Sequence, residues 1–74
     1  MDVVEIDARG LLCPLPVLKA RKAMQSLVSG ARLKLLADDP AAIIDVPHFC
    51  QEAGHRLISQ SEVSDHQIYE LEKG

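Results

Sequence analysis

The residue with the clearest chemical potential is Cys13, which lies in the segment GLLCPLP at residues 10–16. Pro14 suits the first turn of a helix, because the N–H that proline lacks would be unpaired there anyway. Unpaired N–H groups and the helix dipole at such an N-terminus stabilise negative charge. We therefore expect Cys13 to be an exposed nucleophile whose thiol pKa is lowered. Pro14 and Pro16 fix φ and should hold the sulfur in one direction.

Cys13 can also be a structural residue, because free cysteines are among the most buried side chains. It differs from that average in that it precedes a helix instead of lying on a buried helical stripe. Cys50 shows the opposite pattern, since it lies between Phe49 and Ala53 on an apolar stripe. We expect Cys50 to be a core residue.

Three other chemistries of cysteine find little support. Acyl transfer needs an oriented histidine base, and none of His48, His55 and His66 has a spacing that ties it to Cys13. A dithiol oxidoreductase needs a second cysteine nearby, whereas Cys50 is distant in sequence and expected to be buried. A zinc site made of His48, Cys50 and His55 would have few ligands, pointing in different directions. No metal or other cofactor is therefore expected.

A thiolate without a base, a partner thiol or a metal can still accept a group and hand it on as a thioester or persulfide. Such a carrier needs an exposed nucleophile and docking surfaces for a donor and an acceptor. Lys19, Arg21 and Lys22 lie too far along the helix for direct pairing with Cys13, so we interpret them as docking charges. Two alternatives stay open: a regulatory or adaptor module in which Cys13 is a redox sensor or only structural, and a thiol oxidoreductase.

The chain has 74 residues, which predicts one domain over residues 1–74. Its 47% hydrophobic and 26% charged residues are typical of a globular protein. A formal net charge of -3, one Phe, one Tyr and no Trp argue against direct binding of nucleic acid. No signal peptide and no apolar run near the ~20 residues of a membrane span are visible. We expect a cytoplasmic protein with no membrane contact, monomeric in isolation.

The first half of the chain predicts a strand, a helix and a second strand. Residues 3–7 are short and β-branched, and residues 31–37 alternate apolar and basic side chains. Between them the helix should end just before Gly30. Its expected buried stripe consists of Val17, Ala20, Met24, Leu27 and Val28.

The second half predicts a helix and two further strands. Asp39 is a candidate N-cap, with Pro40 in the first turn. Pro47 makes one uninterrupted helix doubtful, so we expect a short turn at 40–44 and a regular helix at 46–53 that Gly54 ends. The expected buried stripe of this helix is Val46, Phe49, Cys50 and Ala53. Residues 55–60 and 67–72 read as strands joined by a hairpin.

The order β-α-β-α-β-β predicts an α/β fold, a two-layer sandwich with a four-stranded sheet. Two successive right-handed crossovers place both helices on the same sheet face when the strand order does not reverse. The other face should be more polar, or should pack on a partner.

The segment DARGLLCPLP at residues 7–16 resembles the signature of the TusA/SirA-like sulfur-carrier family, whose hallmark is Cys-Pro-x-Pro. The similarity continues through Arg21-Lys22, ADDP at 37–40, DVP at 45–47, Phe49-Cys50 and Gly54-His55, and spans residues 3–73. The resemblance implies a fold similar to the C-terminal domain of a translation initiation factor, with a mixed four-stranded sheet whose last strand is antiparallel. It also implies that Cys13 receives a persulfide sulfur from a cysteine desulfurase and relays it to an acceptor protein. In different branches that sulfur serves tRNA thiolation, molybdenum-cofactor synthesis or sulfur oxidation.

Two positions depart from the best-known branch of this family. That branch carries Arg just before the cysteine and Glu between the prolines, where this chain has Leu12 and Leu15. Apolar surface therefore replaces two charges beside the reactive sulfur. We expect a docking surface made of Leu15 and Leu18 with the basic residues Lys19, Arg21 and Lys22.

Overall fold

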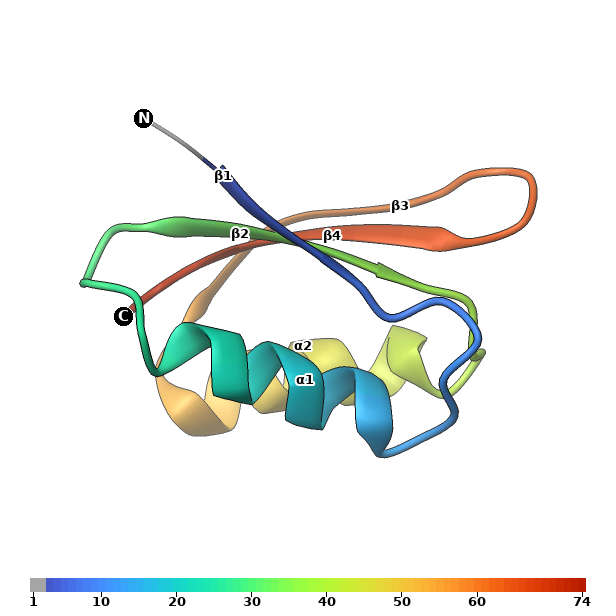
Figure 1. Cartoon of the computed structure of the whole chain (residues 1–74), viewed down its shortest axis with the longest axis horizontal. Coiled ribbons are helices and arrows are strands. Elements are labelled where there is room, and N and C mark those ends of the chain that lie inside the picture. The colour runs from blue at the N-terminus through green and yellow to red at the C-terminus, as the bar shows by residue number, and fades with distance from the viewer. Residues whose placement is uncertain (1–2) are drawn as a thin grey trace.

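Strands and helices follow one another in the order β-α-β-α-β-β, as the sequence predicts, in a computed structural model that describes residues 3–74 (Figure 1). The elements are β1 (Val3–Asp7), α1 (Leu15–Met24), β2 (Arg32–Ala37), α2 (Ala42–Ala53), β3 (Arg56–Glu62) and β4 (Gln67–Glu72). The third strand thus runs two residues beyond its predicted end. In residues 3–74 neither helix is long and apolar enough to cross a bilayer.

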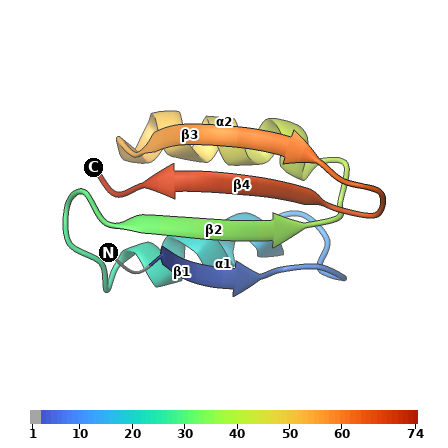
Figure 2. The ribbon, with the colours of Figure 1, turned by 90° about the horizontal axis from the view of Figure 1, so that it is seen from above.

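The four strands form one mixed sheet in the order β1-β2-β4-β3, as Figure 2 shows. β1 pairs with β2 in parallel, and β4 pairs antiparallel with both β2 and β3. Both helices lie against one sheet face, which confirms the predicted two-layer arrangement (Figure 1). Because β1 and β2 are parallel neighbours, the loops that follow them leave the sheet at the same edge.

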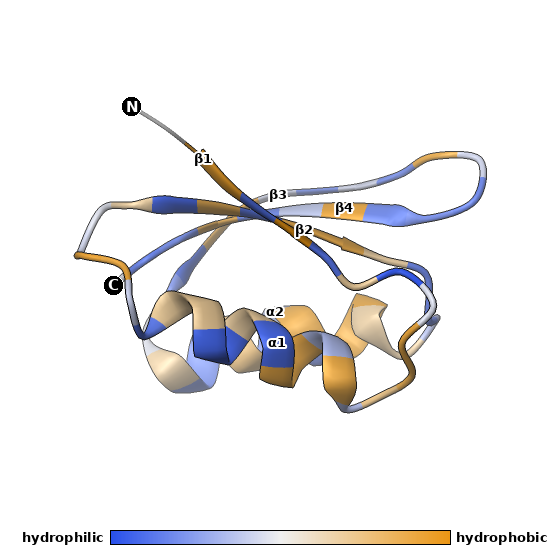
Figure 3. Ribbon diagram, viewed as in Figure 1, coloured by the Kyte–Doolittle hydropathy of each residue, from blue (hydrophilic) through white to orange (hydrophobic). Residues whose placement is uncertain are grey.

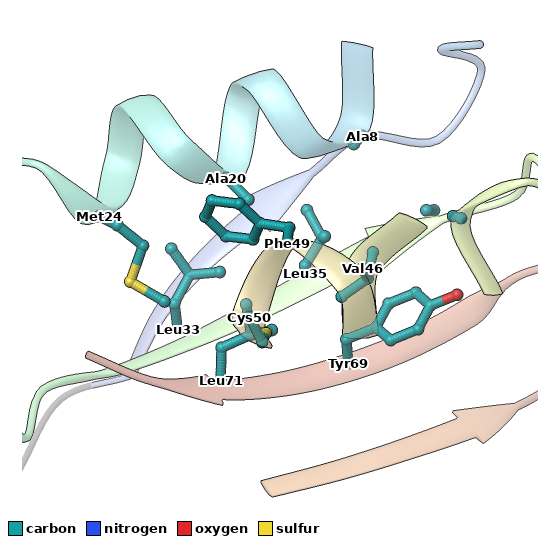
Figure 4. Close-up of a cluster of buried hydrophobic side chains, with 12 residues drawn as sticks. Ala8, Ala20, Met24, Leu33, Leu35, Val46, Phe49, Cys50, Tyr69 and Leu71 are labelled. Atoms are coloured by element: carbon teal, nitrogen blue, oxygen red, sulfur yellow. The ribbon is translucent and has the colours of Figure 1, made fainter. Parts of the chain in front are cut away.

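Apolar side chains from both layers fill the space between the helices and the sheet (Figure 4). Leu33 and Leu35 of β2 are fully buried there, as their alternation with Arg32 and Lys34 predicts. Each large apolar side chain buried in this way stabilises the fold by about 1.5–3 kcal/mol. The other core side chains include Ala20 and Met24 of α1, Val46, Phe49 and Cys50 of α2, and Tyr69 and Leu71 of β4.

The sheet face that has no helix is polar, as expected. Glu72 lies 3.6 Å from Arg32 across the β2–β4 pair, and Lys34 lies 3.8 Å from Glu5 across the β1–β2 pair. Because these pairs are largely solvent-exposed, each adds at most about 1 kcal/mol of stability. The face without a helix therefore carries paired charges across neighbouring strands.

The first helix is shorter than its pattern predicts, because α1 ends at Met24 and not near Gly30. The Lys73 ammonium donates to the Met24 carbonyl at 2.7 Å, and the Ser26 hydroxyl donates to the Ala23 carbonyl at 3.0 Å. These side chains satisfy carbonyls that a further helical turn would otherwise have used. Val28 consequently lies in a loop with 77% of its surface exposed, so its predicted place in the buried stripe was wrong.

The second helix is continuous across Pro47, which corrects the predicted break between a turn and a helix at 46–53. Pro47 removes one hydrogen bond, to Ile43, at a cost of about 3 kcal/mol in a helix interior. Burial of Val46 and Phe49 offsets this, since each contributes about 1.5–3 kcal/mol. Gly54 ends the helix at φ 77°, as predicted. Ala53, however, is exposed and not buried.

Asp39 does not take the N-cap position that the sequence predicts. The helix begins at Ala42, with Ala41 as N-cap and without a side-chain cap. A tight turn precedes it, in which the Asp39 carbonyl accepts the N–H of Ala42 at 3.0 Å and the carboxylate accepts that of Ala41 at 3.1 Å. The carboxylate of Asp39 is thereby left facing the loop that carries Cys13.

Candidate functional site

Cys13 is exposed in the loop between β1 and α1, which confirms the predicted accessibility of its sulfur. Pro14 follows it as the N-cap of α1, and the Pro14 carbonyl accepts the N–H of Leu18 at 3.1 Å. Pro16 is buried in the first turn. The Cys13–Pro14 peptide bond is cis. The two prolines therefore anchor the start of the helix, and the cysteine lies just outside it.

Two adjacent carboxylates hold this loop in place from the neighbouring loop between β2 and α2. Both oxygens of Asp38 lie 3.0 Å from the backbone N of Gly10, which donates to them. Asp39 Oδ2 accepts the backbone N–H of Cys13 at 2.6 Å. These contacts are possible because β1 and β2 are parallel neighbours, so the loops at their carboxyl ends meet. The position of Cys13 is thus set by tertiary contacts as well as by its prolines.

The Cys13 thiol itself donates a hydrogen bond to Asp45 Oδ2 at 2.8 Å. That bond, together with the partial desolvation of the thiol and the negative charges of Asp45 and Asp39, raises the pKa of Cys13 above its usual value. The sequence-based expectation of a lowered pKa was therefore wrong. A full carboxylate charge in contact outweighs the partial charge of a helix N-terminus, which amounts to roughly half an elementary charge.

A pocket of about 190 Å³ opens beside Cys13 between the two helices. Arg21 enters it from α1, and its guanidinium carbon lies 5.5 Å from the centre of the Phe49 ring, a cation–π contact. His48 lies 3.6 Å from Glu52 on the α2 side. The pocket is lined by Val17 and Arg21 of α1 and by Asp45, His48, Phe49 and Glu52 of α2.

The basic residues of α1 are not equivalent. Arg21 lines the same pocket as Cys13. Among the described residues no hydrogen bond or ion pair joins the two, which agrees with the prediction that Arg21 does not pair directly with Cys13. Lys19 donates to the carbonyl of Asp7 at 2.9 Å and ties α1 to the end of β1. Lys22 is exposed.

Exposed leucines surround the start of α1, as the sequence predicts for Leu15 and Leu18. Their exposed fractions are 48% and 45%, and that of Leu12 is 70%. Figure 3 shows that hydrophobic and hydrophilic residues alternate along α1. We call Leu12, Leu15 and Leu18 with Lys19 and Lys22 the α1 surface.

The sequence analysis did not identify Asp45, and it found no spacing that ties His48 to Cys13, yet both residues line the pocket beside Cys13. Their spacing with Glu52 places all three on one face of a continuous helix. Because Pro47 was expected to interrupt the helix, the sequence did not indicate that these three residues share a helix face. Asp39 was noticed only as a helix cap.

Cys50 is a core residue, as predicted, with 3% of its surface exposed, and burial raises the pKa of its thiol. Both cysteines are free thiols. The weak zinc set of His48, Cys50 and His55 does not converge, since Cys50 is buried whereas His48 is exposed. In the part of the chain that the structure describes, no three His, Cys, Asp or Glu side chains are grouped to hold a metal ion.

Comparison with known proteins agrees with this architecture. The crystal structure of a SirA-like protein from Desulfitobacterium hafniense matches with a TM-score of 0.84 and 23% sequence identity, over 96% of this chain and 97% of the other. That likeness shows the same fold. The family model described as sulfurtransferase TusA matches residues 4–73. The chain therefore belongs to the TusA family of sulfur-carrying sulfurtransferases.

Proposed function

We propose that this protein carries sulfur as a persulfide on Cys13. The observation that supports it is the exposure of the Cys13 thiol at the mouth of a pocket, whereas Cys50 is buried. A sulfur carrier must be touched by a donor and then by an acceptor, so its nucleophile has to be reachable from solution. Cys13 meets that requirement, and it lies in the family's Cys-Pro-x-Pro segment.

The transfer step exchanges one sulfur–sulfur bond for another. Cys13 Sγ bonds to the outer sulfur of a donor's persulfide, and the donor's own sulfur–sulfur bond breaks. The donor cysteine leaves as a thiolate and takes up the proton that the Cys13 thiol gives up. Delivery to an acceptor cysteine runs the same exchange in reverse. No external oxidant or reductant is needed in either direction.

We further propose a cysteine desulfurase as donor and a cysteine-bearing acceptor protein as recipient, in the cytoplasm, where thiols stay reduced. Thiolation of tRNA and molybdenum-cofactor synthesis are the pathways that this relay could serve. The carrier itself needs no cofactor beyond the transient persulfide.

The test is intact-mass analysis after incubation with cysteine and a pyridoxal-phosphate cysteine desulfurase, without reductant. The wild-type chain should gain one sulfur atom, which dithiothreitol removes. Cys13→Ser should gain none, whereas Cys50→Ala should load normally. Loading at Cys50, or none at all, would contradict the proposal. Partner binding that survives Cys13→Ser, together with no adduct, would instead identify an adaptor.

The α1 surface is where we propose that a partner docks. Its exposed leucines offer apolar contact, and Lys19 and Lys22 offer positive charge to an acidic partner. Arg21, in the adjoining pocket, adds a further positive charge. Combined Leu12→Arg and Leu15→Glu substitutions should weaken binding of the donor or acceptor. Val28→Glu is the matched control, because Val28 is a comparably exposed apolar residue that lies outside this surface. Unchanged affinity in the double variant would rule out this docking surface.

A further inference from the structure

The Cys13 thiol donates its hydrogen to one carboxylate, that of Asp45. Asp45 Oδ2 lies 2.8 Å from Sγ, and an ionised carboxylate has no hydrogen to donate, so the thiol is the donor. Asp45 lies in the first turn of α2, where the positive end of the helix dipole stabilises its charge. The carboxylate is therefore a fixed acceptor beside the sulfur.

The charges that face the thiol come from three parts of the structure. Asp39, in the loop before α2, accepts the backbone N–H of Cys13 itself. Asp45, His48 and Glu52 line the pocket from α2, and Arg21 lines it from α1. The two carboxylates are in direct contact with Cys13, whereas no hydrogen bond or ion pair joins it to Arg21 or His48 among the described residues. The nearest environment of the sulfur is thus anionic.

We propose that Asp45 is a positioning residue that holds the hydrogen of unloaded Cys13, and so keeps the thiol from reacting with small electrophiles and disulfides before a sulfur donor docks. The benefit of this protection to a carrier rests on the proposed function. The contact between Asp45 and Cys13 does not depend on that function, so the effect of Asp45 on the thiol and the sulfur-carrier role can be tested separately.

The chemistry that Asp45 suppresses needs the thiolate. A thiolate, and not a thiol, attacks a disulfide sulfur. With oxidised glutathione, Sγ would bond to one glutathione sulfur, the glutathione disulfide would break, and the other half would leave as a thiolate. An exposed cysteine blocked in this way could no longer accept sulfur. A carboxylate that stabilises the protonated thiol lowers the fraction of molecules that can react.

The experiment compares Asp45→Asn with Glu52→Gln. Both remove one negative charge from the same pocket, but only Asp45 touches Sγ. The rate of iodoacetamide alkylation is measured against pH for each variant and for the wild type. The midpoint should move to lower pH in Asp45→Asn and stay near the wild-type value in Glu52→Gln. A midpoint that is unchanged in Asp45→Asn, or that shifts equally in both variants, would overturn the proposal.

Cys50 provides an internal check on folding in this experiment. A folded variant should take one alkyl group, at Cys13, whereas an unfolded one should take two, because Cys50 is then exposed. If Asp45→Asn takes two alkyl groups and is therefore unfolded, the measurement is repeated with Asp45→Ala, which removes both the charge and the hydrogen-bond acceptor. The same proteins are then incubated with oxidised glutathione at neutral pH, where mixed-disulfide formation should be faster without the carboxylate. Equal rates would contradict the protective role even if sulfur loading of Cys13 had been demonstrated.

Discussion

Asp45 Oδ2 lies 2.8 Å from Cys13 Sγ, and this contact joins α2 to the loop that precedes α1. It reverses the electrostatic effect that the start of α1 alone would have. The dipole of α1 favours a thiolate, whereas the carboxylate favours the thiol and raises the pKa of Cys13. The sulfur is consequently exposed but held in its less reactive form.

Replacing Cys50 with Ser should reduce stability without affecting the chemistry of Cys13. The Cys50 side chain is buried in the core, and a hydroxyl placed there without a partner costs about 1–3 kcal/mol. Urea denaturation measures the loss. Cys50→Ala is the control for the removal of the sulfur itself. A variant that melts like the wild type but no longer loads sulfur would show that Cys50 belongs to the site.

Replacing Asp39 with Ala should loosen the loop that carries Cys13. The Asp39 carboxylate accepts the N–H groups of Cys13 and Ala41, and losing such bonds at a part-exposed site costs about 1 kcal/mol. Amide hydrogen exchange at Cys13 should speed up. Asp38→Ala, which releases Gly10, should affect the Cys13 amide less. Equal protection of Cys13 in the wild type and in Asp39→Ala would contradict this assignment.

Tyr69 should remain protonated well above the pH at which free tyrosine ionises. Burial, followed by the negative charges of Glu62 and Asp45, raises the pKa of Tyr69 from 10.0 to about 12. A raised pKa in the folded state means that this contribution to stability is complete below pH 10 and is lost as the pH rises towards 12. Because Tyr69 is the sole tyrosine and there is no tryptophan, phenolate absorbance follows it directly.

Tyr69→Phe supplies the control for that titration. The variant loses the hydrogen bond to Gln67 Oε1, at 2.8 Å, and should be less stable by about 1 kcal/mol at neutral pH. Its stability should nevertheless fall less steeply than that of the wild type between pH 10 and 12. A phenol that titrates near pH 10 in the folded protein would show that Tyr69 is not enclosed.

Replacing Gly54 with Ala should destabilise the end of α2 by about 1 kcal/mol. Gly54 has φ 77°, and its N–H donates to the carbonyl of Cys50. No atom lies within 4 Å of the place that a Cβ would take, so the cost is that of the backbone conformation alone. Gly54→Asn should cost less, because Asn tolerates this conformation better. Thermal unfolding compares the three proteins, and an equal loss in both variants would point to a steric cause.

Regular elements with an unambiguous pattern could be predicted closely. β1 and β4 have their predicted bounds, and Leu33 and Leu35 are buried as their alternation indicates. The errors lie where side chains distant in sequence decide the outcome. Lys73 binds the end of α1 at Met24, which no local pattern around Gly30 could indicate. Core packing of Phe49 likewise carries α2 across Pro47.

The sequence by itself determined the order of strands and helices along the chain and the place of Cys13 just before a helix, because hydrophobic periodicity, proline and glycine act locally on the backbone. It also determined that Cys50 is buried, since the spacing of apolar residues places it on the inner side of a helix. Only the tertiary structure decided the electrostatic state of Cys13. The parallel pairing of β1 and β2 and the packing of α1 against α2 bring Asp39, Asp45 and Arg21 to the sulfur's surroundings. Electrostatic effects depend on distance in space, and the order of residues along the chain does not specify that distance.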